Sequence, residues 1–186
     1  MRDREEIKRY KEKLLGILSR AYKRTEIIKC IPQRLEITCN LYPGICIVTV
    51  IESEIDLKYI YAGSPVGIII NSEIYPYPDL LQEIYRCTGD IRSAVEAGPQ
   101  GVKAYLYGND LLVASVEKIY RPFRRGDIVG IIDPSDKRVI GVGRALLDPR
   151  EILRAKAMGR DTEAAVENIF DLGWFLRVLK PVAEEY

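Results

Sequence analysis

Short apolar runs separated by turn-forming residues fill the C-terminal half of the chain, and their spacing constrains the fold more than any other feature. A strand over residues 93–98 runs into a Gly-Pro turn, and a helix is predicted over 99–107. Further strands are predicted at residues 113–120, 127–132, 139–146 and 174–179. Separators such as Arg125-Gly126-Asp127 carry turn chemistry. Many short strands with one inserted helix predict a compact β-barrel-like module of about 80–90 residues.

The N-terminal half has a different pattern, which mixes helices with strands. Apolar residues recur at spacings of three and four over residues 3–23, so we predict an amphipathic helix there. A second helix is expected to start at Pro78 and to end near Gly89. Alternating or β-branched runs predict strands at residues 34–39, 45–51 and 66–70.

At 186 residues the chain can hold one ordinary domain or two small ones. The change of pattern near residue 92 favours two. We therefore predict an α+β protein, with an N-terminal α/β domain at residues 1–92 and a C-terminal β-barrel-like domain at residues 93–182.

The formal net charge of +1 comes from 28 basic and 27 acidic residues, and this balance alone argues against a nucleic-acid binder. The charges are segregated along the chain, however. Residues 1–24 hold nine basic against four acidic residues, and residues 118–160 hold eleven against five. Neutrality therefore does not exclude a basic surface. Positive charge beside aromatic residues such as Tyr107 and Tyr120 is expected of a phosphate-contacting, base-stacking surface, with an ordinary solvated surface as the alternative.

The chain contains no histidine, which excludes a Ser-His-Asp or Cys-His catalytic pair and a His-ligated metal. The segment Gly141-Val142-Gly143-Arg144 lacks the third glycine of a dinucleotide-binding loop, and no Walker A sequence occurs. We therefore expect no catalytic residues, no metal and no cofactor, and a protein that is not an enzyme.

The four cysteines form no C-x-x-C motif, so a zinc ribbon or a thioredoxin-like site is not expected. They are Cys30, Cys39, Cys46 and Cys87. The four cysteines could in principle pair as disulfides. Because three of the four lie in runs predicted to be strands, we expect free thiols that behave as small buried hydrophobic side chains.

The first residues carry charges of both signs and no apolar signal region. The apolar run 66–70 is much shorter than the roughly 20 residues that a membrane span needs. We expect a soluble, cytoplasmic protein with no membrane partner. Few Gln and Asn beside many Ile, Arg, Lys and Glu suggest a thermophilic source.

Several segments together resemble a PUA domain. They are Val95-Glu96-Ala97-Gly98, Leu106 to Leu112, Arg125-Gly126-Asp127-Ile128-Val129 and Val139 to Leu146. Ala165 to Trp174 is similar to the C-terminal part of PUA proteins of the malignant-T-cell-amplified-sequence type, and Gly67 to Leu81 is similar to their pre-PUA domain. Tyr107-Gly108-Asn109 also resembles the small pre-PUA/PUA factors of large-subunit ribosome biogenesis.

The resemblance implies an archaeal-type protein in which a pre-PUA α/β domain precedes a PUA β-barrel-like domain that binds structured RNA. The glycine turn, the short helix and the following strand form the contact surface, because a glycine lets an RNA backbone approach and basic side chains neutralise phosphates. Carried over by position, with nearby basic side chains added, the RNA-binding residues are Arg92, Gly98, Lys103, Tyr107, Asn109, Lys118, Arg121, Arg124, Arg125 and Arg144.

We expect an RNA-binding protein that acts on rRNA or tRNA in translation initiation or recycling, or in ribosome biogenesis. A ribosomal subunit and another translation factor are the candidate protein partners. The alternative is a non-catalytic accessory subunit of an RNA-modification complex. It would dock through the acidic middle of the chain, residues 25–117, which hold twelve acidic against six basic residues. The basic segment 150–165 is either an extra RNA contact or a loop decoration.

Overall fold

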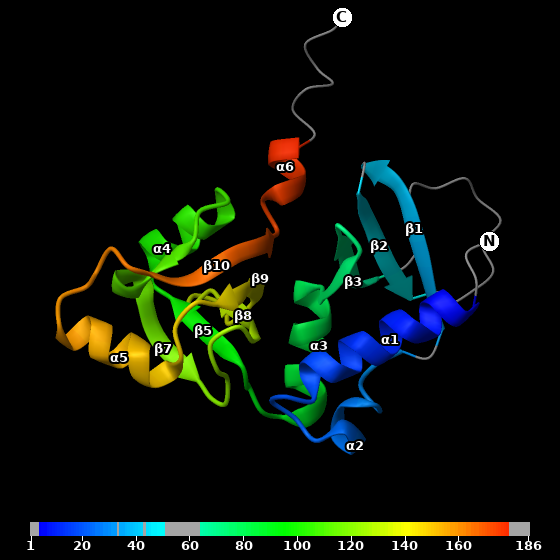
Figure 1. Ribbon diagram of the computed structural model, residues 1–186, viewed down its shortest axis with the longest axis horizontal. Helices are drawn as coiled ribbons and strands as arrows, with labels where there is room; N and C mark the ends of the chain where they lie inside the picture. Colours follow the sequence, from blue (N-terminus) through cyan, green and yellow to red (C-terminus); the bar gives the residue numbers. More distant parts are fainter. Residues whose placement is uncertain (1–3, 33, 43, 51–63, 179–186) are drawn as a thin grey trace, which may run out of the picture. The chain divides into compact units, whose positions relative to one another are not determined.

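The computed structural model describes residues 4–32, 34–42, 44–50 and 64–178. The chain divides into two compact units, Met1–Asp90 and Ile91–Tyr186. Figure 1 shows the order of the elements along the chain. In the part that the structure describes, no helix is both long and apolar enough to cross a membrane.

Within its described residues, the first unit holds an antiparallel sheet of four strands in the order β1-β2-β3-β4. The strands are β1 (Leu35–Tyr42), β2 (Ile45–Val50), β3 (Pro65–Ile70) and β4 (Glu73–Pro76). The helices are α1 (Arg4–Leu18), α2 (Arg24–Ile27) and α3 (Pro78–Thr88). Helix α1 is shorter than the predicted 3–23, since the chain leaves the helix after Leu18 and forms α2 from Arg24.

The core of the first unit forms where α1 and α3 cover the sheet. Leu14 on α1 and Ile84 on α3 are fully buried, as is Ile68 on β3. A Cβ at Gly67 would lie 3.4 Å from Leu14 Cδ1, which is ordinary contact, so α1 packs directly against β3 at this point. Helix α3 starts at Pro78, as predicted, and ends at Gly89, whose φ of 70° favours glycine.

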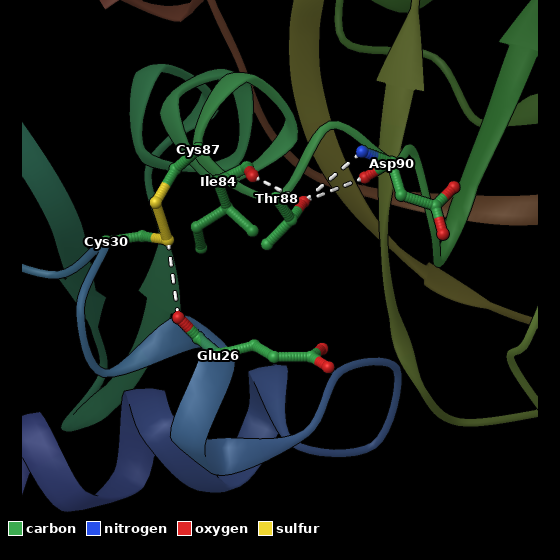
Figure 2. Close-up of a disulfide and its surroundings, with 6 residues drawn as sticks. All are labelled: Glu26, Cys30, Ile84, Cys87, Thr88 and Asp90. Atoms are coloured by element: carbon green, nitrogen blue, oxygen red, sulfur yellow. Dashed lines mark hydrogen bonds between the residues drawn. A yellow bond between two sulfur atoms is a disulfide. The ribbon is translucent and has the colours of Figure 1, made fainter.

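Two disulfides replace the predicted free thiols, and that prediction was wrong. Cys30 follows α2 and bonds to Cys87 on α3, with a Cα–Cα distance of 5.9 Å (Figure 2). Cys39 on β1 bonds to Cys46 on β2. The β1–β2 hairpin places the second pair side by side, and the packing of α2 against α3 brings the first pair together across 57 residues. Neither pairing can be derived from spacing alone.

Across residues 91–178 the second unit has a six-stranded sheet in the order β6-β10-β9-β8-β5-β7. The strands are β5 (Ala94–Ala97), β6 (Leu111–Leu112), β7 (Val116–Tyr120), β8 (Ile128–Ile132), β9 (Val139–Ala145) and β10 (Ala164–Asp171). Pair β5–β8 is parallel and the other pairs are antiparallel. The two edge strands, β6 and β7, are joined by the 3₁₀ turn η1 (Val113–Ser115), so the sheet curls toward closure.

Within residues 91–178 the second unit has three helices: α4 (Pro99–Leu106), α5 (Pro149–Ala157) and α6 (Trp174–Val178). The strand predicted at 174–179 is therefore wrong where the structure describes it, because residues 174–178 form a helix after the turn at Gly173. The predicted strand 113–120 is also divided, into η1 and β7. The α+β class is confirmed.

Two glycines of β9 allow α4 to pack directly on the barrel. A Cβ at Gly141 would lie 2.6 Å from Tyr105 Cε1 and 2.7 Å from the Phe170 carbonyl oxygen. A Cβ at Gly143 would lie 2.4 Å from the Glu167 carbonyl oxygen. The Gly-Val-Gly segment thus serves close packing of α4 and β10 against β9.

Candidate nucleic-acid interface

Helix α4 presents an outer stripe of polar and aromatic side chains. Gln100, Lys103 and Tyr107 recur at helical spacing and are exposed, and Tyr107 is 68% exposed. The opposite stripe, which includes Val102 and Tyr105, is buried in the core. Lys103 forms no ion pair with any described residue. The sequence thus folds α4 so that a lysine and an aromatic ring project one turn apart.

Gly98 is the N-cap of α4. The sequence predicted a glycine turn that lets an RNA backbone approach, but the surroundings of Gly98 are occupied by other parts of the protein. A Cβ at this position would lie 2.7 Å from Glu117 Oε1, so the glycine accommodates a side chain of β7. The Gly98 N–H donates to the Ser115 carbonyl at 2.8 Å, and Pro99 has no N–H to offer. Gly98 therefore joins α4 to the η1–β7 segment, and its own amide is engaged.

Lys118 lies on β7, one residue beyond Glu117. Its cross-strand partner is Glu96 on β5, and its ammonium lies 4.7 Å from the centroid of the Tyr120 ring. Because Val95 and Ala97 face the core, the alternating residue Glu96 and its partner Lys118 lie on the outer face of the sheet. We call Gln100, Lys103, Tyr107 and Lys118 the α4–β7 surface; Gly98, predicted to contact RNA, is buried.

The carboxylate of Glu96, the cross-strand partner of Lys118, is buried. Glu96 accepts hydrogen bonds from Lys137 Nζ and from the Tyr120 hydroxyl, each at 2.8 Å. Burial alone would raise the pKa of Glu96, but these bonds outweigh it, so its pKa lies below the usual 4.5. The pKa of Tyr120 is raised, mainly by burial and secondly by the hydrogen bond to Glu96. The pair Glu96–Lys137 ties the β8–β9 loop to β5.

A hydrogen-bond network fixes the turn after α4, which carries Tyr107 and Asn109. Asn168 Nδ2 donates to the Tyr105 carbonyl at 2.8 Å, and the Asn168 N–H donates to Asp110 Oδ1 at 2.8 Å. Arg177 Nη1 donates to the Leu106 carbonyl. These side chains satisfy carbonyls that a helix end leaves without partners. The C-terminal turn of α4 is thereby held in one conformation.

Tyr105 attaches the buried face of α4 to strand β9. The pKa of this phenol is raised well above its usual 10. Burial is the main cause, and the negative charge of the nearby Asp171 adds to it. The protonated hydroxyl donates to the Val142 carbonyl on β9 at 2.9 Å. Helix α4 is therefore fixed to the barrel at both ends and in its middle.

The family model of the UPF0113 PUA domain matches residues 93–180, the region that holds this surface. Residues 93–180 form a PUA domain. The predicted PUA fold is thus confirmed, whereas membership of the malignant-T-cell-amplified-sequence branch stays a prediction. No curated protein sequence matches the chain.

Solved structures support this fold. A conserved PUA domain protein from Thermoplasma acidophilum matches with a TM-score of 0.54 and 19% identity, over 75% of this chain and 76% of that one. A hypothetical protein from the hyperthermophilic archaeon Pyrococcus horikoshii OT3 matches with a TM-score of 0.61 and 17% identity, over 88% and 90%. A PUA domain from Aeropyrum pernix K1 matches with a TM-score of 0.54 and 16% identity, over 92% and 84%. At these identities the similarity shows the fold alone.

The PUA domain brings only some of the predicted RNA-binding residues together. Arg121 lies at the far end of β7 from Gly98, about 14 Å along the strand by its rise per residue. Arg92 precedes β5 at that same end, since Ala94 pairs with Tyr120. Arg124 follows in the exposed β7–β8 connection. These residues form a second group, separate from the α4–β7 surface.

Two other predicted residues are engaged in ion pairs. Arg125 donates to Glu151 Oε1 of α5 at 2.9 Å. Arg144 lies 3.4 Å from Glu167 on β10. Because Gly143 faces α4, the neighbouring Arg144 points to the opposite face of β9. Lys118 also lies on this outer face of the sheet, but β8 and β5 separate β9 from β7, so Arg144 is not part of the α4–β7 surface.

Sequence reasoning missed the residues that support the surface, which are Asn168, Asp171, Arg177 and Lys137. Asn168 and Asp171 lie in a segment already noted for its resemblance to PUA proteins, but nothing in that pattern states what they contact. Among the described residues, no group of three Cys, Asp or Glu side chains is arranged to hold a metal ion.

Proposed function

We propose that this protein binds structured RNA through the α4–β7 surface of its PUA domain. PUA domains bind RNA, and the match over residues 93–180 is the observation that carries the proposal. The exposed lysines of α4 and β7 supply positive charge for phosphates, and the Tyr107 ring offers a face on which a base can stack.

The rigidity of the surface supports this function. The network of Asn168 and Arg177 holds the turn of Tyr107, and the Tyr105 hydroxyl fixes α4 to β9. A backbone turn that is already held in its bound conformation loses less conformational entropy when a ligand binds. A fixed surface of this kind suits binding, and we propose that the protein is not an enzyme.

We further propose that the RNA is rRNA or tRNA and that the protein acts in translation or ribosome assembly, in the cytoplasm. The resemblance to the malignant-T-cell-amplified-sequence family supports this role, with a ribosomal subunit or another translation factor as partner. The archaeal source of the similar structures, one of them hyperthermophilic, agrees with the thermophile-like composition. Disulfides inside cells are also a feature of hyperthermophiles.

The test is the affinity of the full chain for total tRNA and for rRNA fragments, measured across salt concentrations. We expect binding that weakens steeply with added salt, since phosphate contacts release counterions. The double variant Lys103→Glu with Lys118→Glu is expected to lose at least tenfold in affinity, because each substitution replaces attraction to a phosphate by repulsion.

The matched control is Lys29→Glu with Arg86→Glu, which changes the net charge equally at exposed positions of the first unit. We expect this variant to retain most of the affinity. Absence of RNA binding by the wild-type chain at low salt, together with recovery of a stoichiometric RNA-modifying enzyme, would contradict the proposal and favour the accessory-subunit alternative.

A further inference from the structure

Helix α5 is an amphipathic element held firmly in the PUA domain. Asp148 caps it by accepting hydrogen bonds from the N–H groups of Arg150 and Glu151, and the Glu151 carboxylate accepts one from the Asp148 N–H. Ile152 and Ala155 are fully buried in the core. The direction of its outer side chains is therefore fixed by a cap and by packing.

The outer stripe of α5 offers positive charge without any carboxylate. Its exposed side chains recur at helical spacing and are Arg150, Leu153, Arg154, Ala157 and Met158. The acidic residues of the helix start are engaged elsewhere, Asp148 in the cap and Glu151 in the pair with Arg125. Neither Arg150 nor Arg154 forms an ion pair with a residue that the structure describes.

The segment 113–117 links this stripe to the α4–β7 surface, because both helices pack against it. On one side, the Gly98 N–H donates to the Ser115 carbonyl. On the other side, Lys156 Nζ of α5 donates to the Val116 carbonyl, and the Ala114 N–H donates to the Asp161 carbonyl. Figure 1 shows α4 and α5 on either side of β7. The basic side chains of α4, β7 and α5 thus belong to neighbouring elements of one unit.

We propose that the outer stripe of α5 is a second RNA-backbone contact, so that one RNA spans α4, β7 and α5. This inference rests on the proposed function and names the form of its ligand, an RNA long enough to present phosphates to both helices. Arginine suits the role because its planar guanidinium matches phosphate geometry. The basic segment 150–165 is then an RNA contact and not a loop decoration.

The favoured ligand is RNA rather than an acidic protein because the stripe continues a surface that already carries Lys103 and Lys118. Leu153 and Met158 are 50% and 61% exposed, but single exposed apolar side chains are ordinary on protein surfaces. In an RNA complex they contribute little, whereas a protein partner would need to bury them. This difference separates the two ligands experimentally.

The test compares salt titrations of the full chain bound to a long RNA hairpin. The logarithm of the binding constant falls linearly with the logarithm of the salt concentration, and each phosphate contact adds about 0.9 to the steepness of this fall for a duplex. Variant Arg150→Gln with Arg154→Gln loses two contacts, so its plot is expected to be less steep by about 1.8. Variant Leu153→Ser with Met158→Ser is expected to keep its affinity within threefold. Variant Lys29→Gln with Arg86→Gln, in the first unit, is the charge-matched control and should keep the slope.

An unchanged slope in the arginine variant, while Lys103→Glu with Lys118→Glu still abolishes binding, would overturn the second contact and leave the proposed function intact. Loss of wild-type binding altogether would remove both. An affinity loss in the Leu153/Met158 variant as large as that in the arginine variant would show that the stripe acts through apolar contact, and it would overturn the phosphate-backbone contact. Circular dichroism of each variant checks that α5 is retained.

Discussion

Arg177 and Asp171 form a bidentate ion pair at the base of the α4 turn, with Nη1–Oδ1 and Nη2–Oδ2 distances of 3.0 and 2.6 Å. The Asp171 side chain is 1% exposed, and the Arg177 side chain is 31% exposed. The hydrogen bond to Asp171 raises the pKa of Arg177. The Cζ atom of the same guanidinium would lie only 3.2 Å from a Cβ added at Gly108. Its Nη1 also donates to the Leu106 carbonyl. One buried pair therefore shapes the turn that carries Tyr107.

Replacing Arg177 by Met is expected to lower the free energy of unfolding by about 2 kcal/mol, since it leaves the Asp171 carboxylate buried without its cation. The loss is smaller than for a fully buried pair because Arg177 is partly solvated. Urea denaturation measures it. The control is Arg160→Met, which breaks the more exposed Arg160–Glu163 pair at 3.2 Å and should cost less than about 1 kcal/mol.

The same pair is expected to position Tyr107 for RNA. Arg177→Met should weaken RNA binding in the wild-type background and should add little in a Tyr107→Ala background, because the two changes then act on one contact. Additive losses of affinity would show that Arg177 acts on RNA independently of Tyr107.

Gly101→Ala is expected to destabilise the PUA domain by about 1–3 kcal/mol through overpacking. Its Cβ would lie 2.6 Å from Ser115 Cβ and 3.1 Å from Leu111 Cδ1, so α4 would have to move away from η1. The matched control is Gly16→Ala on α1, where no atom lies within 4 Å of the added Cβ. That variant should gain about 0.5–1 kcal/mol from helix propensity. Equal effects at both positions in thermal denaturation would contradict the packing described here.

Acid is expected to weaken the Glu96–Lys137 pair. Because the folded pKa of Glu96 lies below 4.5, the carboxylate stabilises the folded state fully above pH 4.5 and loses this contribution as the pH falls through the folded pKa. Glu96→Gln should therefore be less stable than the wild type by about 1–2 kcal/mol at pH 7. The gap should close in the acid range. A gap that stays constant from pH 7 to pH 3 would contradict this role, and Glu36→Gln on the exposed face of β1 is the control.

The two disulfides are expected to stabilise the first unit unequally. By the loop-entropy relation, Cys30–Cys87 closes 57 residues and contributes about 4 kcal/mol, whereas Cys39–Cys46 closes seven and contributes about 2 kcal/mol. Paired Cys→Ala variants should lower the urea midpoint in that order. Thiol labelling of the denatured, unreduced chain should find no free cysteine at these four positions. Labelling of all four without reductant would show that the disulfides are absent.

Local sequence signals predicted most of the described elements. Pro78 and Pro99 each start a helix, and the β-branched runs form strands as expected. The run Trp174 to Val178 formed a helix instead, because a short apolar run is compatible with both structures. The role of Gly141 and Gly143 depends on α4 packing over β9, which local pattern does not contain.

The candidate site was harder to predict than the fold because it depends on strand register and on which face a residue occupies. The pairing of Glu96 with Lys118 puts Lys118 on the outer face of the sheet, near the start of α4. Arg144 lies on the same face, but β8 and β5 separate its strand, β9, from β7. Asn168 and Arg177 reach the α4 turn from 63 and 71 residues away. Such contacts follow from the curled sheet and have no signature in the neighbouring sequence.

The central claim, that RNA lies on the α4–β7 surface, is tested most directly by ultraviolet crosslinking of the full chain to a bound structured RNA, with crosslinked peptides identified by mass spectrometry. We predict crosslinks at Tyr107 and in the peptides of Lys103 and Lys118, and their loss at high salt. Crosslinks confined to residues 1–90, with none in 93–180, would contradict the claim.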